Sequence, residues 1–146
     1  MLMQMAPLGG IKEYTASFLI IAGGGAGANR GSGAGAGGYR SSWNNETSGG
    51  GASAQTALTF VGGTVYTITV GAGGGVPSCF GCNGSSGSAS TITGANFTTV
   101  STTGGARGGW SVGQYGYFSP GIDGGCGSGA AYGKSPGNGT TGEGYS

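Results

Sequence analysis

Hydrophobic positions gather in short runs rich in β-branched and aromatic residues, and long glycine-rich stretches separate these runs. Residues 14–22 (YTASFLIIA) form a nearly continuous apolar run that is too short for a typical helix and is ended by Gly23-Gly24-Gly25. Such a run predicts a buried β-strand. Residues 57–61 (ALTFV) and 65–70 (VYTITV) predict a hairpin, because Gly62-Gly63 between them can supply the positive φ angles of a tight turn.

A second hairpin is predicted further along the chain. Residues 89–93 (ASTIT) and 97–101 (FTTVS) repeat the β-rich pattern on either side of Gly94-Ala95-Asn96. No run of helix formers appears anywhere in the sequence. We therefore expect a mainly β fold with extensive irregular structure and no significant helix.

The glycine-rich stretches follow neither the helical nor the strand period. Residues 23–38 read GGGAGANRGSGAGAGG, which suits an extended polyglycine II conformation with about three residues per turn and no internal hydrogen bonds. The amides of such a segment must pair with neighbouring segments, and only Gly and Ala permit that approach. Short antiparallel hairpins packed with polyglycine II-like segments are thus the expected architecture. Close packing is expected at Gly23, Gly24, Gly25, Gly37, Gly38, Gly73 and Gly74.

Composition favours an ordered chain over a disordered one. Of 146 residues, 40 are Gly, and Gly loses the most backbone freedom on folding, so order requires dense backbone hydrogen bonding. Disorder usually accompanies high charge, whereas this chain has 5 basic and 4 acidic residues and also 7 Tyr, 5 Phe and 2 Trp. We expect a flexible leader or linker at residues 1–13 and a single domain at 14–146. Within it, a β-hairpin part (14–103) would precede a glycine- and aromatic-rich loop part (104–146).

Charge and hydropathy argue against nucleic-acid and membrane partners. A net charge of +1, with the basic residues spread singly, gives no field to attract a phosphate backbone. No apolar run approaches the roughly 20 residues that span a bilayer. The start of the chain lacks the basic and apolar regions of a secretory signal. We expect neither nucleic-acid binding nor membrane insertion.

Motifs that suggest chemistry lack the context that the chemistry needs. Gly23, Gly25 and Ala28 match a dinucleotide fingerprint, but the residues that follow do not predict the helix that would hold the pyrophosphate. Gly133-Lys134-Ser135 resembles the end of a P-loop but precedes Pro136. The chain has no His and no nucleophile–base set. The sequence therefore predicts a protein that is not an enzyme, without catalytic residues, cofactor or metal.

The three cysteines leave their redox state open. Cys79 and Cys82 form a CFGC pair, and a zinc site would need two more ligands where only Cys126 remains. In an oxidising medium Cys79 and Cys82 could pair with each other, or one of them could pair with Cys126. Free thiols are the remaining alternative.

Aromatic side chains in glycine- and serine-rich surroundings are the candidate recognition residues. A planar ring beside small residues can stack on a sugar or fill a groove on a host surface. It can equally fill gaps between glycine segments. The candidates for surface recognition are Trp43, Trp110, Tyr115, Tyr117 and Phe118.

The order of these pieces resembles the glycine-rich domain of bacteriophage tail-fibre and receptor-binding (adhesin) proteins. The pieces are YTASFLIIAGGGAGANRGSGAGAGGYR, SGGGASAQ, VYTITVGAGGG, GGARGGW and GTTGEGY, and they cover most of the chain after residue 14. The resemblance implies packed polyglycine II helices, a place on the virion, and loops that recognise host surface molecules. Members of that family usually continue further and are often fused to trimerising segments, so the chain is either a fragment or a stand-alone building block.

Together these observations predict a structural and adhesive module of a phage tail fibre or virion. Its expected partners are further copies of itself, as a trimer or an open filament, and a host cell-surface glycan or protein. The alternative is a self-assembling subunit of an extracellular glycine-rich filament, in which β edges and glycine faces join identical copies.

Overall fold

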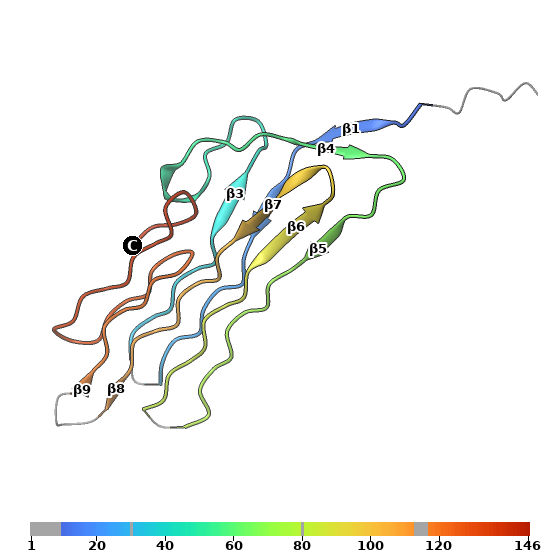
Figure 1. Ribbon diagram of the computed structural model, residues 1–146. Coiled ribbons are helices and arrows are strands. Elements are labelled where there is room, and N and C mark those ends of the chain that lie inside the picture. Colours follow the sequence, from blue (N-terminus) through green and yellow to red (C-terminus); the bar gives the residue numbers. More distant parts are fainter. Residues whose placement is uncertain (1–9, 30, 80, 113–116) are drawn as a thin grey trace, which may run out of the picture.

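Most of the short β-strands lie at one end of the fold, and glycine-rich segments run side by side from there to the other end (Figure 1). The computed structural model describes residues 10–29, 31–79, 81–112 and 117–146. No α-helix occurs among these residues, and one 3-10 turn, η1, spans Gly49–Gly51. The strands are β1 Glu13–Ala16, β2 Leu19–Ile21, β3 Tyr39–Ser41, β4 Leu58–Val61, β5 Thr67–Thr69, β6 Ser90–Gly94, β7 Phe97–Thr102, β8 Ser111–Val112 and β9 Tyr117–Phe118.

All strand pairs are antiparallel. The sheets have the orders β1-β4, β2-β3, β5-β6-β7 and β8-β9. The expectation of a mainly β fold built from short antiparallel pairs is confirmed. The hairpin predicted at 89–101 is also confirmed, since β6 and β7 pair across a turn at Ala95-Asn96.

The hairpin predicted at 57–70 is wrong. β4 pairs with β1, and β5 pairs with β6. Gly63 does adopt a positive φ angle of 81°, so the chain turns where expected. The amide of Val61, however, donates to the hydroxyl of Tyr66 at 2.7 Å, and the chain passes from one sheet to another. The run at 14–22 likewise divides into β1 and β2, which lie in different sheets.

A small side-chain core joins the sheets. Ile20, Leu58 and Ile92 are buried, with exposed fractions of 6 to 8 %, and Phe18, Phe60, Phe97 and Val100 pack against them. Phe60 makes edge-to-face contacts with Tyr66 and Phe97 at centroid distances of 4.8 and 5.7 Å. This cluster lies entirely at the strand end, so other contacts must hold the glycine segments in a defined structure.

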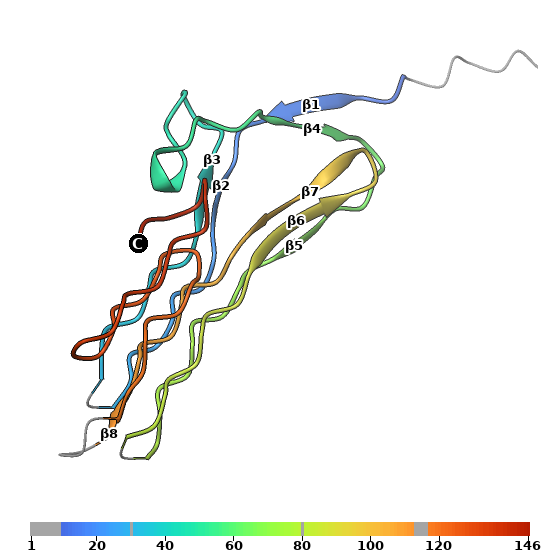
Figure 2. The same cartoon turned by 60° about the vertical axis from the view of Figure 1, so that its left-hand side comes forward.

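The glycine segments run side by side away from the strands (Figures 1 and 2). We name them g1 (22–29), g2 (31–38), g3 (70–77), g4 (82–89), g5 (103–110), g6 (119–124), g7 (126–130) and g8 (135–146). Most continue a strand directly: β2 leads into g1, g2 into β3, β5 into g3, g4 into β6, and β7 into g5. Segments from the predicted hairpin and loop parts therefore interleave in one bundle.

Backbone hydrogen bonds in the bundle repeat every third residue. In g1, the amides of Ala22 and Gly25 donate to carbonyls of g2, and those of Gly23 and Ala26 donate to carbonyls of g4, all at 2.9 to 3.0 Å. Successive amides of one segment thus reach different neighbours. This is the bonding pattern of polyglycine II, whose helix has about three residues per turn.

The segments form two layers. In the first layer g3, g1, g2 and g7 are joined in that order, and in the second layer g4, g5 and g6 are joined, while g8 lies against g6 and g7. The joining bonds run from Gly74 to Gly24, Gly25 to Gly35, Cys126 to Ala36, Gly87 to Gly105 and Ser119 to Trp110. Bonds between the layers, such as that from Gly35 to Ala106 at 2.8 Å, complete the packing.

Most of the glycines expected at close-packed positions do lie against neighbouring backbone. A Cβ at Gly23, Gly25, Gly37 or Gly74 would overlap a carbonyl oxygen of another segment, and one at Gly38 would lie 2.6 Å from the Glu143 carboxylate. Gly24 and Gly73 differ, because the nearest atoms to an added Cβ are 3.9 and 3.7 Å away. Both residues face outward, since in a helix with a three-residue turn only part of each segment points to a neighbour.

Candidate recognition surfaces

Turns that are distant in sequence converge at the end of the bundle that lies away from β1–β7. We call this end the tip; it comprises the ends of g1 and g2, of g3 and g4, the β8–β9 hairpin, and the turn at 131–134 (Figures 1 and 2). The amide of Ser32 in g2 donates to the carbonyl of Gly109 in g5 at 2.8 Å. The amide of Ala131 donates to the carbonyl of Ser119 at 3.3 Å. These bonds hold the turns to one another.

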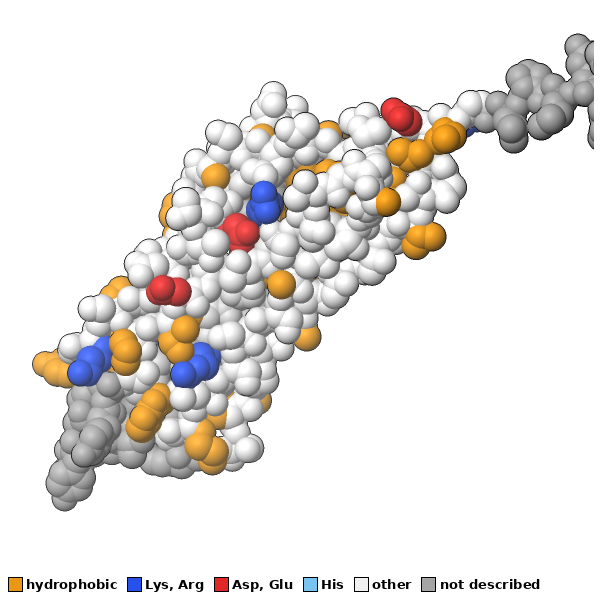
Figure 3. Space-filling view, viewed as in Figure 1, with side chains coloured by type: hydrophobic (Ala, Val, Ile, Leu, Met, Phe, Trp, Pro, Cys, Tyr) orange, Lys and Arg blue, Asp and Glu red, His pale blue; other side chains and the backbone are white. Residues whose placement is uncertain are grey.

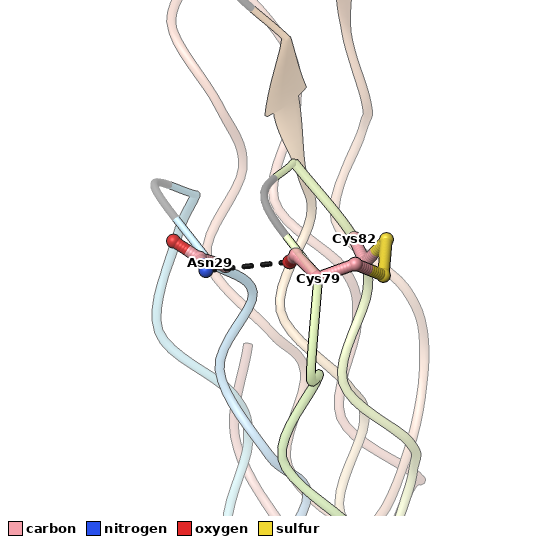
Figure 4. Close-up of a disulfide and its surroundings, with 3 residues drawn as sticks. All are labelled: Asn29, Cys79 and Cys82. Carbon is pink, nitrogen blue, oxygen red and sulfur yellow. Dashed lines mark hydrogen bonds between the residues drawn. A yellow bond between two sulfur atoms is a disulfide. The ribbon is translucent and has the colours of Figure 1, made fainter.

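A disulfide and an asparagine organise one side of the tip (Figure 4). Cys79 and Cys82 are disulfide-bonded, which settles the alternatives left open by the sequence, and the thiol of Cys126 is free. Asn29 donates from its amide to the carbonyl of Cys82 at 3.2 Å and from its side chain to the carbonyl of Cys79 at 3.3 Å. The turn between g3 and g4 is therefore fixed both covalently and by the end of g1.

The predicted aromatic residues near the tip belong to the β8–β9 hairpin and its entry. Trp110 ends g5, is partly buried, and its carbonyl accepts a hydrogen bond from Ser119 at 3.0 Å. Tyr117 and Phe118 form β9, which pairs with β8. Tyr115 lies outside the described residues. Trp110, Tyr117 and Phe118 are thus brought together by one hairpin.

Trp43 lies at the opposite end of the molecule, just after β3. Its side chain is 63 % exposed, in a turn where Asn44 and Asn45 have positive φ angles. The buried hydroxyl of Ser41 accepts a hydrogen bond from the Trp43 amide at 3.1 Å and donates to the Glu46 carboxylate at 3.3 Å. The predicted recognition set is therefore divided between two separate surfaces.

Tyr132 is a tip residue that was not among the predicted recognition residues. It lies in the turn at 131–134 and is 87 % exposed. The backbone amide of Lys134 donates a hydrogen bond to the carbonyl of Ala131 at 3.1 Å and closes this turn. Its local sequence, an aromatic between Ala and Gly, is the same signal that marked the other candidates, and only its position in the fold distinguishes it.

The carboxylates serve mainly as hydrogen-bond acceptors within the fold. Asp123 accepts from the amide of Asn138 at 2.6 Å, and Glu143 accepts from the amide of Thr103 at 2.6 Å, which joins g8 to g5.

Burial raises the pKa of the Tyr39 hydroxyl, and the neighbouring Glu46 carboxylate raises it further. On the face that Figure 3 shows, charged side chains form only isolated patches, and most of the surface is uncharged.

The dinucleotide fingerprint and the CFGC pair both lack the structure that their chemistry needs. Gly23, Gly25 and Ala28 lie in g1, an extended segment, so no helix N-terminus follows the strand. The thiols of the CFGC pair are consumed by the disulfide. No group of three or more His, Cys, Asp or Glu suited to a metal occurs in the described ranges. Among those residues there is also no helix long and apolar enough to cross a membrane.

Comparisons of this chain with protein-family models, with curated proteins and with solved structures found no match. The candidate surfaces are therefore interpreted from their own geometry and from the sequence resemblance described above.

Proposed function

We propose that this chain is a non-catalytic adhesive module of a phage tail fibre or virion, and that its tip contributes to recognition of a host surface. The observation that carries the proposal is the convergence of chain-distant turns at one end of a hydrogen-bonded bundle. Rigid scaffolds that present loops at one end are a common arrangement for binding, because the loops vary while the scaffold holds them in place.

The chemistry of the tip supports recognition of a neutral or polar surface. Tyr132 and Asn29 are exposed there, and the disulfide and Asn29 restrict the turn between g3 and g4. A preorganised site loses less conformational entropy on binding than a flexible one. A disulfide also suits the oxidising surroundings of a virion surface. The resemblance to glycine-rich domains of phage receptor-binding proteins points in the same direction.

The test compares two exposed aromatic residues at opposite ends. Fluorescently labelled chain is incubated with a panel of bacterial strains, and bound fluorescence is measured for the wild type, Tyr132→Ala and Trp43→Ala. Both side chains are largely exposed, so neither change is expected to disturb folding. We expect Tyr132→Ala to weaken binding about tenfold or more, as loss of an aromatic contact does, and Trp43→Ala to leave it unchanged.

The opposite ranking would place recognition at the strand end, and binding to no strain would contradict the adhesive role. Treating the bound strain with protease or with periodate separates the two classes of host ligand. Loss of binding after periodate indicates a glycan, and loss after protease indicates a protein.

A further inference from the structure

Some glycines lie where the fold of a single chain does not require glycine. Within the described chain, a Cβ at Gly33 would meet no atom within 4 Å, and one at Gly24, Gly27 or Gly73 would make only ordinary contacts of 3.6 to 3.9 Å. None of these residues has a positive φ angle. Glycine in ordered backbone costs about 0.5–1 kcal/mol relative to alanine, because its unfolded state is more flexible. Contacts within the chain do not offset that cost here.

These glycines share one outer surface of the first layer. Gly24 and Gly27 lie in g1, Gly33 and Ala36 in g2, and Gly73 in g3, and these segments are hydrogen-bonded neighbours. Residues three apart in a polyglycine II helix point the same way, so 24 and 27 share a direction, as do 33 and 36. All are exposed. We call the surface formed by Gly24, Gly27, Gly33, Ala36 and Gly73 the glycine face; the exposed Val76 of g3 borders it.

The glycine face also presents unpaired backbone donors. In the part of the chain that the structure describes, the amides of Gly24, Gly27, Gly33, Ala36 and Gly73 have no hydrogen-bond partner in the protein. The amides beside them, such as those of Gly25 and Gly74, donate to neighbouring segments at 2.9 and 2.8 Å. The outer surface therefore repeats the donor pattern of the interior with no segment above it.

An apolar hollow continues the glycine face toward the strands. Its volume is about 300 Å³, and Leu19, Ile21, Ile68 and Val70 contribute to its lining. Ile21 directly precedes g1 and Val70 begins g3, so the hollow adjoins the face. Ile21, Ile68 and Val70 are 54, 68 and 83 % exposed. Contiguous exposed apolar residues of this kind mark interaction sites in soluble proteins.

We propose that the glycine face and the adjoining hollow form the interface with a second copy of this chain, packed face to face as a two-fold dimer. The interior shows what packs on a glycine layer, namely another layer of polyglycine II segments that supplies carbonyl acceptors. In a two-fold dimer the first layer of the second copy takes that place. Among the described residues the carbonyls of Gly25 in g1 and Ala34 in g2 accept no hydrogen bond and can serve as acceptors, and the residues of the glycine face are uncharged. A two-fold interface uses the same patch on both copies.

The opposite layer explains why association stops at two copies. The exposed residues of this layer include Asp123 in g6 and Ser85 and Ser86 in g4. This polar layer does not repeat the glycine pattern of the first layer. The dimer therefore closes, whereas a head-to-tail contact between different surfaces would grow into a filament.

The experiment measures the solution mass of the untagged chain by sedimentation over a wide concentration range. We expect a monomer–dimer equilibrium for the wild type. Gly24→Arg and Gly33→Arg should each raise the dissociation constant of the dimer at least about a hundredfold, because both copies would then place a bulky, positively charged side chain in the interface. The control is Ala89→Arg, an exposed position on g4 in the opposite layer, which leaves the equilibrium unchanged. Circular dichroism and the urea midpoint of each variant establish that it is folded.

A wild type that stays monomeric at every concentration would overturn the proposal. So would a dimer that both glycine variants leave intact, or a mass that grows without limit. The adhesive role is tested separately, since Gly33→Arg leaves Tyr132 and Trp43 in place for cell binding.

Discussion

The strand end and the glycine bundle are held together in different ways. At the strand end, side chains such as Ile20, Leu58 and Ile92 exclude water from a small core. In the bundle the buried side chains are small, for example Ala26 and Ala106, and cohesion comes from backbone hydrogen bonds between segments. The first region is specified by what its side chains fill, and the second by the absence of side chains. Enlarging a side chain should therefore destabilise the bundle most, whereas removing side-chain volume should destabilise the strand end most.

The largest effect is expected from adding one methyl group inside the bundle. In Gly104→Ala the new Cβ would overlap the carbonyl oxygen of Gly87, and both partners are backbone, so neither can move aside cheaply. We expect a loss of more than about 3 kcal/mol of unfolding free energy, or failure to fold.

The matched control is Gly75→Ala, where an added Cβ meets nothing within 4 Å and φ is not positive. We expect its stability to lie within about 0.5 kcal/mol of the wild type or slightly above it. Urea unfolding followed by tryptophan fluorescence measures both variants. Equal losses at the two positions would show that close backbone approach is not what excludes side chains from the bundle.

A smaller loss is expected from removing side-chain volume at the strand end. Leu58→Ala deletes most of a buried side chain and leaves a cavity beside Ile20 and Ile92, at a cost of about 2–4 kcal/mol. Leu19→Ala, at a position that is 58 % exposed, should cost less than about 1 kcal/mol. The same urea titrations make the comparison, and a larger loss for Leu19 would contradict the assigned core.

Ser90 tests the junction between the two regions. Its buried hydroxyl accepts a hydrogen bond from the amide of Gly71 at 2.8 Å and donates to the carbonyl of Ile21 at 2.7 Å. Ser90→Ala leaves both backbone groups without this partner, which should cost about 1–3 kcal/mol. Ser90→Thr keeps the hydroxyl and is the comparison variant. An unchanged urea midpoint for the alanine variant would mean that the two regions are joined by other contacts.

The smallest global effect is expected from opening the disulfide. The bridge has a sequence separation of only 3, and the loop-entropy relation gives about 2 kcal/mol or less for so short a loop. The double variant Cys79→Ser with Cys82→Ser should therefore shift the urea midpoint little. Hydrogen exchange should instead accelerate at the Asn29 amide, which donates to Cys82. Exchange that rises equally across g1 and g5 would show that the tip is not a local unit.

Local patterns in the sequence predicted the elements better than their partners. The β6–β7 hairpin was predictable because both strands flank a short turn, and the polyglycine segments were predictable because nothing else accommodates residues 23–38. The pairing of β1 with β4 was missed, because the turn at Gly62-Gly63 fits a hairpin as well as it fits a crossing between sheets. Which glycine segments are neighbours was not predictable either, since glycines carry no side chain that specifies a partner.

The candidate surfaces show the same limit. Trp43 and Trp110 each follow two small residues, Ser41-Ser42 and Gly108-Gly109, yet the first tryptophan follows β3 and the second leads into the β8–β9 hairpin at the tip. Only the fold separates them. Gly24 and Gly25 are likewise indistinguishable in sequence, although one faces outward and the other lies against Ala106.

The three-residue repeat of the bundle also makes its length adjustable in fixed steps. Each segment advances about 3.1 Å per residue, so inserting one triplet into each of two paired segments would lengthen the bundle by about 9 Å and return every donor to its original direction. An insertion of one or two residues would rotate the segment and turn glycines away from their neighbours. Because the hydrogen bonds in g1 repeat every three residues, insertions in multiples of three would move the tip outward and leave the hydrogen-bond pattern of the interior unchanged.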